Sequence, residues 1–564
     1  MDMKRQRCLL IASLVLAFAY GQTTLAQHAD RPDVKYWIFL KDKLDAAGKT
    51  TPVEADYLSE RTRERRARRG TAVTPTLDAP LSDVYLDELR RRGITPLVES
   101  RWLNAVSARL DERQREAVRK LSFVRELRPV AQGKSATVHE EEAASAPLIP
   151  FARRLTHLDY GNSETQLEVI NAILPLERGI NGDSVRLGIL DSEFGGFEHP
   201  AFAALVNNGR LLADSNFVGQ AQSSRHGRRV ASIAVGFDEG ELIGPAYGAE
   251  LLAATTEFDS GLDSRQEEDN FVAALEWMES EGVDVVNISL IYNFPFEGGN
   301  SYTPDQMDGD TGVTTVAADQ AAMLGVVVVA AAGNEGSNNW HIIGTPADGD
   351  SVIAVGSVAS NKTKAGSSSF GPTADGRTKP DVAAMGSRVW LANTNTNYGT
   401  GSGTSFASPL VAAVACQILQ VNPDLTPMQV RDLLRETASQ AENPDNALGW
   451  GIIDADAAIR RAEELATATE DQAPIPDAFE VLSPYPNPFS DQTVFEIRAP
   501  ANAGFARMSV YNLLGQRVAL PFEGRLNPGV NRIVLRAATL PAGLYLYRLE
   551  GDQVSHAGKV MLVR

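Results

Sequence analysis

Between residues 146 and 464, short apolar runs alternate with segments of helical periodicity, and this pattern restricts the fold more than any other feature. Apolar runs without polar alternation are typical of strands buried on both faces, as in a parallel sheet. Parallel strands need crossover connections, so we expect an α/β domain with helices on both faces of the sheet. The runs are Val185–Leu190, Leu251–Ala254, Val283–Ile288, Val326–Ala332 and Val352–Val355.

Three of these runs end directly on polar residues. Leu190 is followed by Asp191, Ile288 by Ser289, and Ala332 by Gly333-Asn334. The carboxyl ends of parallel strands meet at one edge of the sheet, where ligands bind in open α/β folds. We therefore expect these polar residues to lie at a functional site.

A histidine and a serine complete a set of residues suited to nucleophilic acyl transfer. His226 opens the segment His226–Ser232, and Ser405 lies in Gly403–Pro409. This chemistry needs a hydroxyl, an imidazole that takes its proton, a carboxylate that orients the imidazole, and donors for the oxyanion. Asp191 could supply the carboxylate, Asn334 a side-chain amide, and a helix beginning near Ser405 an unpaired backbone N–H.

Each residue alone also has a structural interpretation. An aspartate at a strand end can be a hydrogen-bond acceptor, a histidine beside glycine a surface residue, and an asparagine between glycines a turn residue. The order Asp, His, Asn, Ser is more specific. Asp before His before Ser is the order found in subtilisin, and it differs from the orders in chymotrypsin and the α/β-hydrolases.

The chain from about Tyr160 to Asp454 resembles the subtilase family of serine proteases. The matching motifs are Gly403–Pro409, Ala332-Gly333-Asn334, Val352–Gly356 and Lys379–Val382. The resemblance implies a subtilisin-like sheet, hydrolysis of peptide bonds, and no required cofactor. It also implies Asp191 as the orienting acid, His226 as general base and acid, Ser405 as nucleophile, Asn334 as oxyanion donor, and Ser289, Leu290, Gly333 and Glu335 as substrate-binding residues.

Three departures from the family pattern leave two other functions open. Glu193 and Ile291 stand where the family has glycine, and Arg228-Arg229 replaces Thr-His. None removes a catalytic group, but Glu193 and Arg228-Arg229 motivate an alternative, a catalytically silent surface-binding protein on the same scaffold. An esterase using the same triad is a second one. The stretch Tyr292–Gly312 resembles an insertion, and Glu335 at the pocket rim suggests some preference for basic side chains.

The first 26 residues predict export. Lys4, Arg5 and Arg7 precede the apolar run Cys8–Tyr20, and Ala26 ends a small-residue cleavage motif, as in a secretory signal peptide. Removal of this segment leaves Cys416 as the sole cysteine of the mature chain, so no internal disulfide can form. Its small apolar neighbours predict a buried structural thiol.

Residues 27–145 predict a small sheet carrying two helices. Tyr36–Leu40 and Ile94–Ala108 are strand-like, while Leu81–Arg92 and Glu112–Leu127 are helical. The block resembles subtilase propeptides, which implies a ferredoxin-like α+β inhibitor and folding chaperone, with Trp102–Val106 in one strand. The acidic stretch Glu140–Ser145 predicts a linker, and we expect cleavage of the zymogen within 130–150.

Charge separates this block from the next. The chain carries a net charge of −19, which argues against nucleic acid as a partner. Residues 1–145 hold 26 basic and 21 acidic side chains, whereas residues 146–464 hold 18 and 42. Six arginines crowd into Arg61–Arg69, and this cluster is either a solvated helix face or a surface that meets the acidic domain.

Residues 480–564, after a linker at 465–479, predict a small all-β sandwich. The expected strands are Val494–Ile497, Met508–Tyr511, Ile533–Leu535 and Leu544–Leu549, with turn signals between them. Tyr485–Phe489, Val510–Gly515 and Leu540–Tyr545 resemble sorting domains of the type IX secretion system of Bacteroidetes-like bacteria. The resemblance implies the type IX machinery as a partner and release from, or attachment to, the surface of a diderm bacterium. A carbohydrate- or protein-binding β module is the alternative.

Oxygen ligands for a metal occur close together in one loop. Asp305, Asp308 and Asp310 surround Gly309 and could hold a structural calcium ion, although an acidic surface loop has the same composition. No paired-cysteine zinc spacing and no phosphate-binding glycine loop is present in the sequence.

Overall fold

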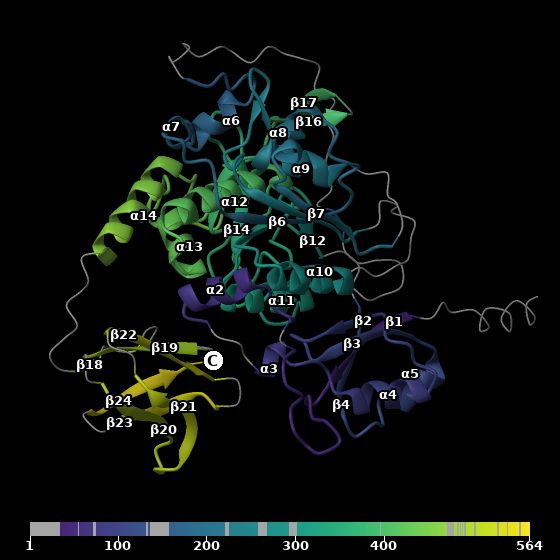
Figure 1. The fold of residues 1–564 in the computed structure, drawn as a ribbon, viewed down its shortest axis with the longest axis vertical. Helices are drawn as coiled ribbons and strands as arrows, with labels where there is room; N and C mark the ends of the chain where they lie inside the picture. The colour runs from purple at the N-terminus through teal and green to yellow at the C-terminus, as the bar shows by residue number, and fades with distance from the viewer. Residues whose placement is uncertain are drawn as a thin grey trace, which may run out of the picture. The chain divides into compact units, whose positions relative to one another are not determined.

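Figure 1 shows the computed structural model, whose chain divides into two compact units, residues 1–463 and 464–564. The signal segment 1–26 and the linker Glu140–Ser145 lie outside the described residues. Those residues are 34–54, 56–71, 75–130, 134–135, 157–219, 225–257, 268–292, 302–394, 396–470, 479–481, 484, 487, 489, 492–500, 503–526, 529–537, 540–551 and 554–563.

A seven-stranded parallel sheet forms the centre of the first unit, as the apolar runs predict. Its spatial order is β15-β14-β13-β11-β6-β10-β7, so the chain proceeds in opposite directions from β6, which creates a switch point. The strands are β6 (Arg186–Asp191), β7 (Leu211–Asn216), β10 (Glu250–Thr255), β11 (Val285–Ile288), β13 (Val327–Ala331), β14 (Ile353–Val358) and β15 (Val382–Met385).

Helices cover both faces of this sheet. Figure 1 shows α10 (Glu268–Ser280) and α11 (Val313–Met323) below it, and α9 (His226–Val235) and α12 (Thr404–Val421) above it. Because successive strand residues face opposite sides, Leu190, Val286 and Val328 pack with α10 and α11 in one core. Helix α12 is long and apolar enough to cross a membrane, yet 89% of its 18 residues are buried inside the domain, as in a core helix.

Smaller elements surround the sheet. They are α6 (Glu164–Val169), α7 (Ile173–Glu177), η1 (Pro200–Phe202), α8 (Ala203–Asn207), β8 (Phe237–Asp238), β9 (Leu242–Ile243), β12 (Leu290–Ile291), η2 (Pro304–Gln306), β16 (Val389–Thr394), β17 (Asn397–Gly401), α13 (Pro427–Glu436) and α14 (Ala455–Glu470).

Residues 34–130 form the expected ferredoxin-like block. Its antiparallel sheet has the order β2-β3-β1-β4, with β1 at Val34–Leu40. Tyr36, Ile38 and Leu40 face α4 (Asp83–Arg91) and α5 (Glu112–Val118) in a core of their own, whereas Trp37 and Phe39 join the core that includes α10 and α11. Both faces of β1 are therefore buried, and one of them is buried against the large domain.

Two boundaries in this block differ from the prediction. The helix expected over Glu112–Leu127 ends at Val118, and Val124–Pro129 instead forms β4, which pairs with β1. The strand expected over Ile94–Ala108 is two strands, β2 (Val98–Ser100) and β3 (Ala105–Leu110). Trp102 therefore lies in a turn and not in a strand. That turn ends at Asn104, whose φ of 48° suits asparagine.

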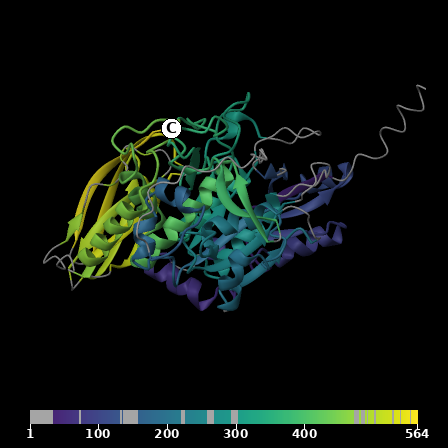
Figure 2. The same ribbon diagram turned by 90° about the horizontal axis from the view of Figure 1, so that it is seen from above.

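The second unit has the predicted sandwich of two antiparallel sheets, β18-β19-β22 and β21-β20-β23-β24, and each expected strand lies within an observed one. Side chains from both sheets, including Phe495, Ile533, Met508 and Leu549, share one core. Figure 2 shows these strands, coloured yellow, running side by side. Their bounds are β18 (Glu480–Val481), β19 (Gln492–Ala499), β20 (Phe505–Tyr511), β21 (Arg517–Arg525), β22 (Gly529–Arg536), β23 (Gly543–Gly551) and β24 (Ser555–Leu562).

Candidate active site

Asp191 and His226 form a buried hydrogen-bonded pair. Asp191 is the last residue of β6, and His226 is the first of α9. The imidazole Nδ1 lies 2.6 Å from Asp191 Oδ1, which also accepts the backbone N–H of Ser192 at 2.7 Å. Gly227 permits this approach, because a Cβ there would lie 3.0 Å from Asp191 Cβ. A carboxylate can only accept here, so Nδ1 donates and Nε2 carries the lone pair.

Ser405 is fully buried in the first turn of α12. The His226 and Phe406 rings are 5.5 Å apart between centroids, which places the imidazole beside the residue that follows Ser405. The first four N–H groups of a helix have no acceptor within it, so the Ser405 N–H is available to a developing oxyanion.

A proline and a second serine fix the backbone of Ser405. Pro409 lies inside α12 and has no N–H, so it gives no helical hydrogen bond to the Ser405 carbonyl four residues earlier. Ser289 Oγ donates to that carbonyl at 2.9 Å and accepts from Asn287 Nδ2 at 3.1 Å, while Ser408 Oγ donates to Asn287 Oδ1 at 2.7 Å. This buried network ties the start of α12 to the end of β11.

Asn334 is held in one orientation. Its Oδ1 accepts the backbone N–H of Thr404 at 2.9 Å and the Thr404 hydroxyl at 3.0 Å, which turns the amide nitrogen to the other side. Gly403 has a φ of 149°, and a Cβ there would lie 3.0 Å from Asn334 Nδ2. A side chain at this position would crowd the amide that the sequence assigns to an oxyanion.

The departures from the expected motif do not involve these residues. The Glu193 carboxylate accepts the N–H groups of Phe194 and Gly195, both at 3.1 Å. Arg228 donates to the Asn393 carbonyl at 2.6 Å, and Arg229 donates to the Asn393 side chain at 2.7 Å. The two arginines thus bind β16 and leave the imidazole and its carboxylate in place.

The predicted substrate-binding segment pairs with another part of the chain. Leu290 and Ile291 form β12, which is antiparallel to β5, Lys134–Ser135. Peptides often bind by adding a strand to an exposed edge, and β5 occupies such an edge here. Ser289 donates to the Ser405 carbonyl, the Gly333 N–H donates to the Thr404 hydroxyl at 3.1 Å, and Leu290 is buried in β12. Glu335 is also buried, with a carboxylate that accepts from Asn338.

Four acidic residues on α10 bind the 34–130 block, and the sequence reasoning missed them. Their spacing over 268, 269, 276 and 279 places them along one helix face, which was the available signal. Glu268 accepts from Trp37 Nε1 at 3.3 Å, and Lys35 Nζ lies 2.7 Å from Asp269. Glu276 accepts the backbone N–H groups of Arg101 at 3.1 Å and Trp102 at 3.3 Å, and Glu279 accepts from Arg65 and Arg66.

The other predicted features have simpler surroundings. Cys416 is buried, and burial raises the pKa of its thiol well above the usual value, as expected for a structural cysteine. Asp308 accepts from the N–H groups of Asp310 and Thr311 and so closes its own turn. No group of three or more acidic, histidine or cysteine side chains suited to a metal occurs in the described part of the chain, and calcium binding at Asp305, Asp308 and Asp310 stays a prediction.

Three family models match this chain. They are the subtilase family over residues 182–451, a peptidase S8 propeptide domain of Bacteroidota over 35–145, and a secretion system C-terminal sorting domain over 483–563. Subtilisin DY from Bacillus licheniformis is 34% identical over 289 residues, which cover 50% of this chain and 93% of that protein. The chain belongs to the subtilase family. It has a subtilase propeptide, and its sorting domain marks it as a secreted or cell-surface protein.

Other relatives cover more of the chain. Subtilisin NAT from Bacillus subtilis subsp. natto is 30% identical over 390 residues, which cover 68% of this subtilase and 88% of that protein. A solved protease structure from Pseudoalteromonas arctica is 23% identical, with a TM-score of 0.43 over 54% of this chain and 99% of that one.

Replacing Ser289 by alanine should weaken the fold at the site. The change leaves the buried Ser405 carbonyl without its donor, which costs about 1–3 kcal/mol. The free energy of unfolding, measured with urea in a Ser405→Ala background, should fall by that amount. The exposed Ser360→Ala is the matched control, and an equal effect of both variants would contradict the positioning role.

Propeptide binding should depend on the protonation of Glu276. Burial raises the pKa of Glu276 to about 7, despite hydrogen bonds from Ser100, Arg101 and Trp102. The bound state therefore favours the protonated form, so this contribution is complete below the ordinary pKa of 4.5 and is lost as pH rises through about 7. Lys43, whose pKa burial lowers to about 8, titrates above that window.

The measurement is the dissociation rate of the propeptide between pH 4.5 and 7.5 after the chain is cut between residues 136 and 145. Dissociation should accelerate as pH rises, and Glu276→Gln should flatten the slope. The exposed Glu281→Gln is the control. An unchanged slope in Glu276→Gln would show that another group controls the pH dependence.

Proposed function

We propose that this subtilase is a secreted serine endopeptidase made as a zymogen. Ser405 Oγ attacks the carbonyl carbon of a peptide bond and transfers its proton to His226 Nε2. The imidazolium, held by Asp191, then gives that proton to the leaving amine, and an acyl-enzyme remains. His226 next takes a proton from water, whose oxygen attacks the acyl carbon. The imidazolium then returns this proton to Ser405 Oγ as the acid is released.

Two donors are assigned to the negative oxygen of the tetrahedral intermediate. They are Asn334 Nδ2 and the backbone N–H of Ser405 at the start of α12. Because the bond from Thr404 fixes the Asn334 amide before substrate arrives, little reorganisation is needed when charge develops. A peptide substrate would lie in an extended form along β12, where β5 lies in the zymogen.

The observation that carries the proposal is the 2.6 Å hydrogen bond between buried Asp191 and His226, beside the helix that begins at Thr404. An aspartate with a purely structural role would not require a histidine beside the first turn of that helix. The alternative of a silent binding protein loses its motivation, because Glu193 binds its own turn and Arg228 binds Asn393.

Labelling of the mature enzyme by a fluorophosphonate should occur at Ser405 alone and should accompany casein hydrolysis. Ser405→Ala should abolish both and leave the zymogen uncut. The exposed Ser360→Ala, outside the buried network that fixes Ser405, should keep the label. A mature protein that takes up no label at Ser405 would support the silent binding protein instead, and turnover of esters without peptides would support an esterase.

Removal of the Asn334 amide should affect the transition state more than substrate binding. We expect Asn334→Ala to lower kcat about 10²–10³-fold, the typical cost of losing one preorganised oxyanion donor, with little change in KM. Steady-state kinetics on a chromogenic peptide test this, with the exposed Asn339→Ala as a neighbouring comparison. A rise in KM at constant kcat would assign Asn334 to substrate binding.

A further inference from the structure

The arginine cluster of the propeptide forms helix α2, Glu60–Arg68, and its arginines fall into two groups. Arg65, Arg66 and Arg69 are buried and Arg61 is half-buried, whereas Arg63 and Arg68 are exposed. The buried residues share a face because positions three and four apart are neighbours on a helix. One side of α2 is therefore docked and the other is solvated.

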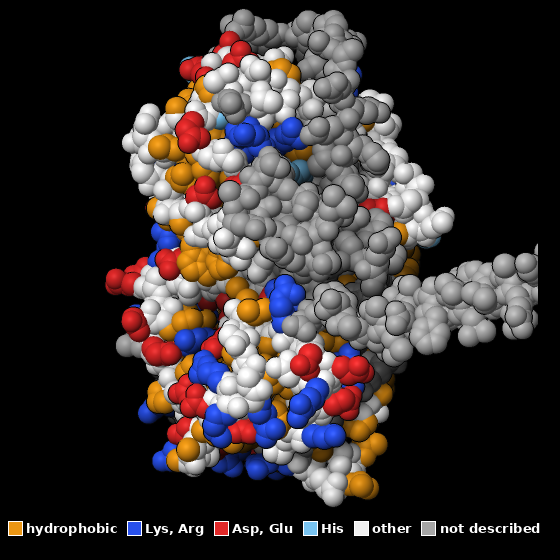
Figure 3. All heavy atoms as spheres, turned by 90° about the vertical axis from the view of Figure 1, so that its right-hand side faces the viewer, with side chains coloured by type: hydrophobic (Ala, Val, Ile, Leu, Met, Phe, Trp, Pro, Cys, Tyr) orange, Lys and Arg blue, Asp and Glu red, His pale blue; other side chains and the backbone are white. Residues whose placement is uncertain are grey.

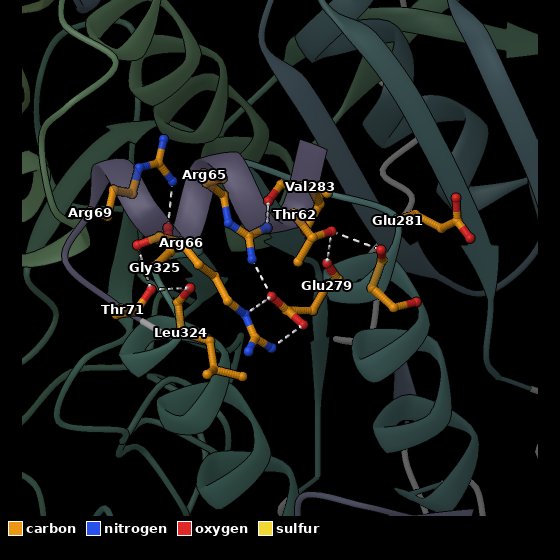
Figure 4. Close-up of polar contacts among 12 residues, drawn as sticks. Thr62, Arg65, Arg66, Arg69, Thr71, Glu279, Glu281, Val283, Leu324 and Gly325 are labelled. Atoms are coloured by element: carbon orange, nitrogen blue, oxygen red, sulfur yellow. Dashed lines mark hydrogen bonds and ion pairs between the residues drawn. The ribbon is translucent and has the colours of Figure 1, made fainter. Parts of the chain in front are cut away.

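The docked side binds the C-terminal end of α10. Arg66 donates to both oxygens of Glu279 at 2.9 and 2.8 Å and to Asp78 at 2.8 and 3.0 Å. Arg65 donates to Glu279 and to the Val283 carbonyl. Figure 4 shows both guanidinium groups converging on the one carboxylate.

A second carboxylate, that of Asp284, binds one arginine near each end of α2. Arg61 Nη2 lies 2.6 Å from Asp284 Oδ2, and Arg69 Nη2 lies 3.3 Å from Asp284 Oδ1. Arg61 also donates to the Gly282 carbonyl at 3.1 Å, and Arg69 to the Gly325 carbonyl. We call the surface formed by Glu279, Gly282, Val283, Asp284 and Gly325 the α2 receptor.

The α2 receptor lies at the amino ends of the parallel strands, and the catalytic residues lie at their carboxyl ends. Gly282, Val283 and Asp284 immediately precede β11, and Gly325 precedes β13, whereas Ser289 and Asn334 follow the same two strands. At about 3.3 Å per residue, the two ends of a strand of five residues are roughly 16 Å apart. A contact at the receptor therefore cannot occupy β12 or cover Ser405 by itself.

These contacts differ in kind from the ion pairs on the outer helices of the propeptide. Pairs on α4 and α5, such as Arg90–Asp87 and Arg119–Glu116, join exposed side chains. Figure 3, which draws the right-hand side of Figure 1, shows Lys and Arg mixed with Asp and Glu over the lower part of that face. Exposed pairs of this kind contribute little to binding, whereas buried arginine forks fix one geometry.

We propose that α2 is an anchor of the propeptide in its own right, which holds it on the α2 receptor independently of the pairing of β5 with β12. The receptor recognises arginine because the Glu279 carboxylate accepts paired N–H donors and the neighbouring backbone carbonyls accept others. Only a planar, multidentate cation can reach these acceptors together. The affinity of the propeptide is thus divided between the strand that occupies β12 and the contacts along α10 and at the α2 receptor, which only bind.

The test uses the full chain with Ser405→Ala, so that it does not depend on the proposed proteolytic function. A cleavage site for an unrelated protease replaces residues within 136–145, and dissociation of the cut propeptide is followed by size exclusion and fluorescence. Arg65→Ala with Arg66→Ala should accelerate dissociation about 100-fold or more, because each leaves buried Glu279 short of a partner. Arg68→Ala removes one exposed charge from the same helix and should change the rate less than about 2-fold.

Two further comparisons keep the proposal open to refutation if the alanine variants fold poorly. Arg65→Lys with Arg66→Lys keeps the charge and removes the forks, and it should still accelerate dissociation about 10-fold or more. Glu279→Gln should act like the arginine variants and be non-additive with them, whereas the exposed Glu281→Gln should be neutral. Equal effects of the buried and exposed variants, or no effect of the lysine variants, would show that bulk charge attraction and not docking holds the propeptide.

Discussion

Four carboxylates on one face of α10 are buried, and each needs donors to remain there. The propeptide supplies donors to all of them, from Trp37 at Glu268 near one end of the helix to Arg66 at Glu279 near the other. Helix α10 runs from the carboxyl ends of the parallel strands, where the catalytic residues lie, back to their amino ends. The four carboxylates therefore hold the propeptide along the full length of the strands. The strand β5 can then reach β12, and α2 can reach the end of α10.

In the active site, too, a buried acceptor needs a donor, and this acceptor is the Ser405 carbonyl. Pro409 removes a donor from the first turns of α12, and Ser289 replaces it with a hydroxyl at the end of β11. The helix that carries Ser405 is thereby fixed to the strand whose continuation forms β12. Positions of nucleophile and substrate-binding strand are thus coupled through one buried network that includes Asn287.

Much of the fold and of the candidate site could be predicted from local sequence. Apolar runs such as Val326–Ala332 marked strands because burial on both faces leaves no polar alternation, and the residues that follow them met at one edge as expected. Local patterns failed where pairing with a distant strand decided the outcome. Val124–Pro129 has a helical composition, yet it becomes β4 because β1 offers a free edge.

The sequence by itself determined the family, the order of Asp191, His226, Asn334 and Ser405, and the concentration of positive charge at Arg61–Arg69, since these depend on residue identity and spacing. It left open whether the arginine cluster is solvated or docked. Only the tertiary structure decided this, because a charged helix has no preferred neighbour until folding brings Glu279 and Asp284 together at the ends of α10 and β11. Burial then converts a diffuse attraction between two parts of the chain into a contact with defined donors and acceptors.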